Sequence, residues 1–285
     1  MKDASKKPAS EEAAPSPAEK LARLKTIVTH IADQWGAVLH RQTYFHAMTR
    51  STELADALQS TYAAHVHNTV TDTFVIDLIR EIGAMVLDRD SNSASVAVAV
   101  RTLRDPLVLD ELRKDYRIVL PSRWLSGRVP AEVRRDFDDA HRERQIIENL
   151  AEFEQRLADV TKIPASILDT EIGELLRIAR NKSVAHYDVV RDGADWRMWH
   201  IEGMGLTYGK LDEYVDACTS AVDGLLRLVK RTAHDFEGTR RVAQDYANDY
   251  VGALVIGLQR KKEIREERLA NADHVLTQHT KSTGG

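Results

Sequence analysis

The nine residues RNKSVAHYD, at positions 180–188, begin at the last residue of the amphipathic run LLRIAR and combine an arginine, an amide and a histidine. The guanidinium of Arg180 is permanently charged and can bind a phosphate through paired N–H donors. The imidazole of His186 is the side chain best suited to moving a proton near neutral pH. The stretch therefore predicts a site that handles phosphodiesters, carried at the end of a helix.

Apolar residues recur at helical spacing on both sides of this stretch. The upstream stripe consists of Leu21, Leu24, Ile27, Ile31, Trp35 and Val38, and the downstream stripe of Leu211, Val215, Cys218, Val222, Leu225 and Val229. Only seven prolines and fourteen glycines occur in 285 residues, which favours long helices over a turn-rich β fold. We predict an all-α, multi-helix bundle.

Shorter patterns divide the remainder of the chain. Further helices are expected over 54–62, 70–87, about 94–104, from Pro106, and over 131–160, with a loop at 88–93 and another at 121–130. Pro164 should interrupt the chain again, and Ser166 can cap the helix that carries the motif. The segment 189–206 alternates and contains Asp192-Gly193, which predicts a short hairpin or an irregular flap.

The domain organisation follows from composition. Residues 1–17 are rich in Ala, Pro, Ser, Lys and Glu and are expected to form a disordered tail. Residues 18–235 are expected to form the main helical domain, and 236–285 a C-terminal helix with a frayed end. Thr207 is expected to cap the helix that carries the downstream stripe.

Charge and cysteine content exclude several classes of protein. The formal charge of −4 argues against a protein that coats nucleic acid non-specifically. Cys218 is the single cysteine, lies in an apolar stripe and is expected to be a buried hydrophobe in a reducing compartment. The N-terminus resembles no secretion signal, and no run of eighteen apolar residues exists, so a cytoplasmic location without membrane contact is expected.

The spacing of the motif constrains its geometry. Six residues of continuous helix correspond to about 600°, or about 240° net, with about 9 Å of rise, so Arg180 and His186 would point to different sides. Either the helix is interrupted after Arg180, or two copies of the motif face each other across a two-fold axis. We therefore expect the site at a dimer interface.

The residues suit attack of an RNA 2′-hydroxyl on the adjacent phosphate. His186 can act as base or acid, Arg180 can stabilise the charge of the phosphorane, and Asn181 can orient His186 or donate to a phosphate oxygen. Two neighbouring cations, Lys182 and Arg177, are assigned to substrate binding. This scheme requires no metal and no cofactor, and DNA would be spared because it lacks the 2′-hydroxyl.

The string RNKSVAHYD after LLRIAR resembles the signature of the HEPN superfamily, an arginine followed after four to six residues by a histidine. The segment IREIGAMVLDRDSNSASVAVAVRTLRD is similar to the abortive-phage-infection (AbiU-like) branch, which carries an aspartate-rich loop before a Ser-led helix. The resemblance covers roughly residues 20–235 and also includes LTYGKLDEYVDA after the flap.

The resemblance implies an all-α domain that forms a homodimer through the motif helices and cleaves RNA without a metal. Such proteins act in phage defence or toxin–antitoxin systems, so an antitoxin or another defence protein is an expected partner. The implied catalytic residues are Arg180, His186 and Asn181. Toxins silenced by nucleotide transfer have a tyrosine two residues after the histidine, whereas Asp188 stands there and Tyr187 is adjacent, which argues against that regulation.

Other interpretations remain open. The same fold can serve as a non-catalytic module that binds RNA or a protein partner, or as a scaffold that assembles through its apolar stripes. Trp196 and Trp199 can stack bases, although packing within the hairpin is favoured. His65 and His67 do not share a helix face and have no carboxylate at metal-like spacing, so no metal site is predicted.

Overall fold

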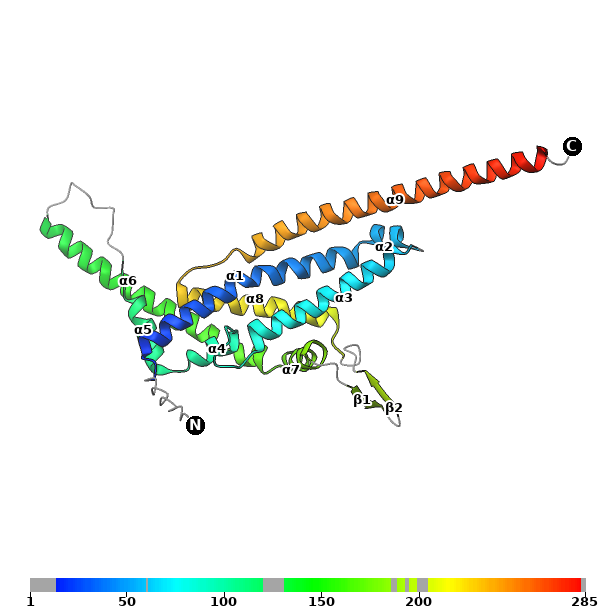
Figure 1. Ribbon diagram of the computed structural model, residues 1–285. Helices are drawn as coiled ribbons and strands as arrows, with labels where there is room; N and C mark the ends of the chain where they lie inside the picture. The colour runs from blue at the N-terminus through cyan, green and yellow to red at the C-terminus, as the bar shows by residue number, and fades with distance from the viewer. Residues whose placement is uncertain are drawn as a thin grey trace, which may run out of the picture.

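The computed structural model describes residues 14–59, 61–119, 131–185, 189–192, 195–198 and 205–282. For residues 131–138, 183–185, 189–192, 195–198 and 275–282 it describes the backbone alone. Within these ranges the chain is almost entirely helical, with one short antiparallel hairpin (Figure 1). The predicted all-α class is confirmed.

Helix α1 (Pro17–Arg50) is the central element of the bundle. It begins in a capping box, in which the Ser16 hydroxyl accepts from the Glu19 amide and the Glu19 carboxylate accepts from the Ser16 amide. Pro17 occupies the first helical position, where its missing N–H costs no hydrogen bond. The helix contacts α3, α4, α5, α8 and α9, so it supplies the core against which the other elements pack.

Five shorter elements follow α1, and with them the chain runs back alongside α1. They are α2 (Thr52–Leu58), α3 (Ala63–Ile82), the π-helical turn η1 (Gly83–Leu87), α4 (Val96–Thr102) and α5 (Pro106–Tyr116). The side chains of Ser51, Ser95 and Asp105 cap α2, α4 and α5 by accepting from a backbone amide. The loop predicted at 121–130 lies outside the described residues.

The motif-bearing region begins with α6 (Ala131–Val160), the π-helical turn η3 (Pro164–Leu168) and α7 (Glu171–Ala179). The prediction that Ser166 caps the motif helix is wrong. Its hydroxyl donates to the carbonyl of Lys162 within the preceding turn, and Thr170 caps α7 by accepting from the Gly173 amide at 3.1 Å. Pro164 starts η3 because its fixed φ is compatible with the first turn of a helix.

A π-helical turn, η4 (Arg180–Ala185), continues α7, and a hairpin follows it. Strand β1 (Val189–Asp192) pairs antiparallel with β2 (Asp195–Met198), with Val189 opposite Met198 and Asp192 opposite Asp195. This hairpin occupies the segment in which alternation and Asp192-Gly193 predicted one. The side chains of Trp196 and Trp199 lie outside the description, so their role stays a prediction.

The last two helices complete the bundle. Helix α8 (Tyr208–Lys230) is capped by Thr207, as predicted, and packs on α1 and α6. Helix α9 (Phe236–Ser282) packs on α1 and α2, and its C-terminal half runs past the end of the bundle (Figure 1). Four small or β-branched side chains are buried along α9, and two of them, Val251 and Val255, pack in a cluster with Met48, Leu54 and Leu58; the four are Ala243, Ala247, Val251 and Val255.

The core confirms the two apolar stripes. Trp35 is fully buried, and its indole N–H donates to the Thr219 hydroxyl at 2.9 Å, which joins α1 to α8. Cys218 is buried as predicted, and burial raises the pKa of its thiol, so it is a packing residue and not a nucleophile. Each fully buried large apolar side chain contributes about 1.5–3 kcal/mol to folding.

Candidate functional site

The candidate site lies where the α-helix that carries the motif changes its geometry. Helix α7 buries Gly173, Leu176 and Ala179 against the bundle and ends at Ala179. From Arg180 the backbone forms a π-helical turn, whose hydrogen bonds span five residues instead of four. Regular α-helical geometry therefore does not continue from Arg180 toward His186. Such turns frequently occur at functional sites.

Arg180 is fixed by two groups of the α3–α4 connection. Its Nη1 donates to the carbonyl of Gly83 at 3.3 Å, and its Nη2 donates to Oδ2 of Asp88 at 3.3 Å. The side chain remains 32% exposed. A guanidinium has five N–H groups, and the contacts with Gly83 and Asp88 use two of them, so within the described residues three N–H groups are left for a ligand.

Gly83 makes this placement sterically possible. A Cβ added to Gly83 would lie 2.6 Å from Cδ of Arg180, which is closer than real Cβ contacts, and 3.3 Å from its Cγ, which is a tight contact. Gly83 is the first residue of η1, and Arg180 is the first residue of η4. The two π-helical turns therefore meet where each of them begins. Because Gly83 has no side chain, the side chain of Arg180 can pass close to it and reach Asp88.

The aspartate-rich loop after η1 holds Asp88 in position. Oδ1 of Asp88 accepts from the Asp90 amide at 3.0 Å, and its carbonyl accepts from the hydroxyl of Ser95. Arg89 forms an ion pair with Asp169 at 3.0 Å, which joins the loop to the start of the motif helix. Both ends of α7 are therefore tied to this loop, one through Asp169 and the other through Arg180.

The other residues predicted for the site lie in different surroundings. Asn181 is exposed and Lys182 is partly exposed, so both are accessible to a large ligand. Arg177 forms an ion pair with Glu174 one turn earlier in α7. His186 lies outside the described residues, as do Tyr187 and Asp188. Whether His186 meets Arg180, in one chain or across two, stays a prediction.

Sequence reasoning missed Gly83 and Asp88 as parts of the site. Asp88 lies in the loop predicted at 88–93, and nothing in its spacing connects it with a residue 92 positions later. A signal existed for Gly83, because a lone glycine within an otherwise helical apolar run often has a packing reason. Its partner could not be identified without the fold.

A second polar cluster joins α1, α8 and α9 on another part of the bundle. Oδ1 of Asp212 accepts from Gln42 at 2.9 Å and contacts Nε2 of His46 at 2.8 Å, while Oδ2 pairs with Arg50 at 2.9 Å. Burial lowers the pKa of His46 and outweighs the opposing effect of the Asp212 carboxylate. Arg240 pairs with Asp216 alongside. The cluster connects three helices, which gives it a structural role.

No group of three or more His, Cys, Asp or Glu side chains among the described residues is placed to hold a metal ion. No helix within the described part of the chain has a stretch apolar and long enough to cross a bilayer.

The helical bundle and the Arg-x5-His sequence after α7 are features of the HEPN class. The family model HEPN_AbiU2, described as AbiU2, matches residues 21–250, which is most of the chain. The chain therefore belongs to the AbiU2 family of abortive-infection HEPN proteins. Comparisons with curated proteins and with solved structures gave no significant match.

Proposed function

We propose that this protein is an endoribonuclease that acts as a homodimer in the cytoplasm, in phage defence or a toxin–antitoxin system. The proposal rests on the exposure and the hydrogen bonds of Arg180. The family motif's arginine is partly exposed and is aligned by the Gly83 carbonyl and the Asp88 carboxylate, contacts that occupy two of its five N–H groups among the described residues.

The reaction needs only groups that the motif contains. The 2′-hydroxyl of one nucleotide attacks its own phosphate, the 5′-oxygen of the next nucleotide leaves, and a 2′,3′-cyclic phosphate and a 5′-hydroxyl are formed. His186 removes or supplies the proton, and Arg180 stabilises the charge that develops on the phosphorane oxygens. Asn181 donates to a phosphate oxygen, and Lys182 and Arg177 bind neighbouring phosphates.

Asp88 is suited to hold Arg180 in position for the substrate. Its ion pair with Arg180 is partly exposed and worth about 0.2–1 kcal/mol, so it aligns the side chain without burying it. A phosphate can bind the N–H groups that the contacts with Asp88 and the Gly83 carbonyl leave unused. The arginine would then be ordered before binding, which reduces the entropy lost on forming the complex.

Expression in a bacterial host tests the proposal without knowledge of the RNA target. We expect the wild-type protein to arrest growth and His186→Ala to permit it at the same protein level, because the variant lacks the group that transfers the proton. Equal toxicity of the two proteins would contradict catalysis and favour a non-catalytic module that binds RNA or a partner protein. Immunoblotting would establish the equal protein levels.

A further inference from the structure

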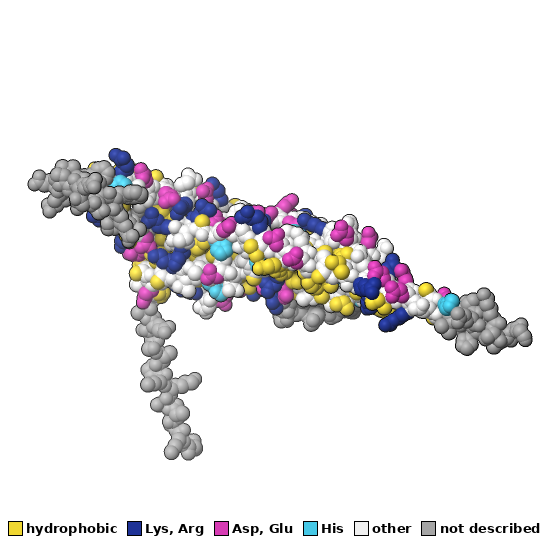
Figure 2. Space-filling view, turned by 90° about the horizontal axis from the view of Figure 1, so that it is seen from above, with side chains coloured by type: hydrophobic (Ala, Val, Ile, Leu, Met, Phe, Trp, Pro, Cys, Tyr) yellow, Lys and Arg dark blue, Asp and Glu magenta, His cyan; other side chains and the backbone are white. Residues whose placement is uncertain are grey.

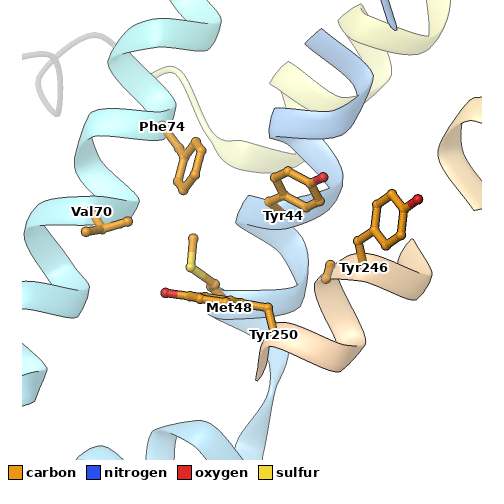
Figure 3. Close-up of a pocket in the computed structure, with 7 residues that line it drawn as sticks. Tyr44, Met48, Val70, Phe74, Tyr246 and Tyr250 are labelled. Carbon is orange, nitrogen blue, oxygen red and sulfur yellow. The ribbon is translucent and has the colours of Figure 1, made fainter. Parts of the chain in front are cut away.

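An apolar groove lies between α1, α3 and α9, away from the motif. It encloses a cavity of about 340 Å³ with walls almost entirely aromatic or aliphatic (Figure 3). Tyr44 and Met48 come from α1, Val70 and Phe74 from α3, and Tyr246 and Tyr250 from α9; Ala247 completes the lining. Among the residues that the structure describes, no charged side chain lines this cavity.

The walls of the groove extend outward as exposed apolar side chains. Tyr246 is 60% and Tyr250 55% exposed on α9. Val66 on α3 is 66% exposed, and Tyr62, the residue that precedes α3, is 94% exposed; they lie four and eight residues before Val70. Hydrophobic side chains gather in a band across the middle of the α9 face, with charged side chains on both sides (Figure 2). The band is therefore longer than the cavity itself.

The exposed area of the tyrosines is close to the apolar area that one partner contributes to a standard protein–protein interface. The three tyrosines alone expose about 400 Å², since a tyrosine has about 200 Å² to bury. A stable complex takes about 800 Å² from each partner, and about 57% of this area, or about 450 Å², is apolar. The band thus supplies the apolar share of one side of such an interface.

We propose that this surface, made of Tyr62, Val66, Val70, Tyr246 and Tyr250, binds the same surface of a second copy of the chain. An isologous contact requires protruding groups and a recess on one patch, because each copy presents the same residues. Here the exposed tyrosines protrude next to the groove that can receive them. A small ligand would fill the cavity and leave Val66 and Tyr62 uncovered.

This contact is distinct from pairing through the motif. Gly83, which contacts Arg180, follows Phe74 by nine residues, or about 900° of helix, and so lies on the opposite side of α3. Both contacts can form in one assembly, which would be a tetramer if the two-fold axes of the two contacts are perpendicular and intersect. The groove contact does not depend on whether the protein cleaves RNA.

Analytical ultracentrifugation of the full chain tests the proposal. Tyr246→Arg and Val66→Arg each place a guanidinium in the proposed contact, one on α9 and one on α3. The contact would bury this charge without an opposite charge beside it, which is costly. Both residues are more than half exposed in the single chain, so its fold should persist. Ile147→Arg on α6, where Ile147 is 69% exposed, is the matched control.

We expect the wild type and the control to share one mass and the two groove variants to have half of it. Circular dichroism should show equal helicity in all four proteins. A monomeric wild type would overturn the proposal, as would groove variants that keep the wild-type mass. If Tyr246→Arg alone reduced the mass and Val66→Arg did not, the contact would not extend along α3 as proposed.

Discussion

Arg180→Ala is expected to lower the rate of RNA cleavage by about 10²–10³-fold, the usual loss when a donor to a developing oxyanion is removed. The rate should be measured in single-turnover reactions, so that product release does not hide the chemical step. Arg180→Lys should recover only part of the rate, because an ammonium retains the charge but cannot form the paired contact of a guanidinium.

The control for Arg180→Ala is Arg104→Ala, which removes an exposed arginine after α4 and should cleave RNA like the wild type. Stability should change little in Arg180→Ala, since the ion pair with Asp88 is partly exposed. Unchanged cleavage by Arg180→Ala would show that the arginine does not contact the reacting phosphate.

Gly83→Ala should reduce cleavage by roughly ten- to a hundred-fold, because a displacement of about 1 Å at a reacting group can cost about 10²-fold. The new methyl group would lie 2.6 Å from Cδ of Arg180, so the arginine has to move away from Asp88. Alanine is otherwise favourable in a helix, by about 0.5–1 kcal/mol over glycine, so a general loss of stability is not expected.

Gly36→Ala is the matched control for the glycine substitution. A Cβ at position 36 would meet only Cγ2 of Thr239 at 3.7 Å, an ordinary contact, so cleavage should be unchanged. Thermal unfolding of both variants would separate a local effect on Arg180 from a loss of fold. Normal cleavage by Gly83→Ala would show that the observed position of Arg180 is not needed for activity.

Most of the helical framework could be predicted from the sequence. The stripes that contain Trp35 and Cys218 identified α1 and α8 because burial on one side of a helix imposes a period of 3.6 residues. The cap at Thr207 followed from the preference of hydroxyl side chains for helix starts. These features are local, so they can be read from neighbouring residues.

The parts that could not be predicted depend on contacts between distant segments or on unusual backbone geometry. The π-helical turn at Arg180 has no composition that distinguishes it from an α-helix. Asp88 and Gly83 meet Arg180 only after α3 and α7 have packed together. Ser166 was a reasonable cap by type, but the turn that Pro164 begins moved the cap to Thr170.

The central claim is that Arg180 and His186 cleave RNA through the 2′-hydroxyl. The direct test incubates the purified protein with bacterial total RNA to locate a cleaved site, and then with two oligonucleotides spanning it, one all-RNA and one with a single 2′-deoxy sugar 5′ to the scissile phosphate. We predict cleavage of the all-RNA strand to a 2′,3′-cyclic phosphate, an intact deoxy strand, and no product with His186→Ala. Cleavage of the deoxy strand at the wild-type rate, or undiminished activity of His186→Ala, would contradict the claim.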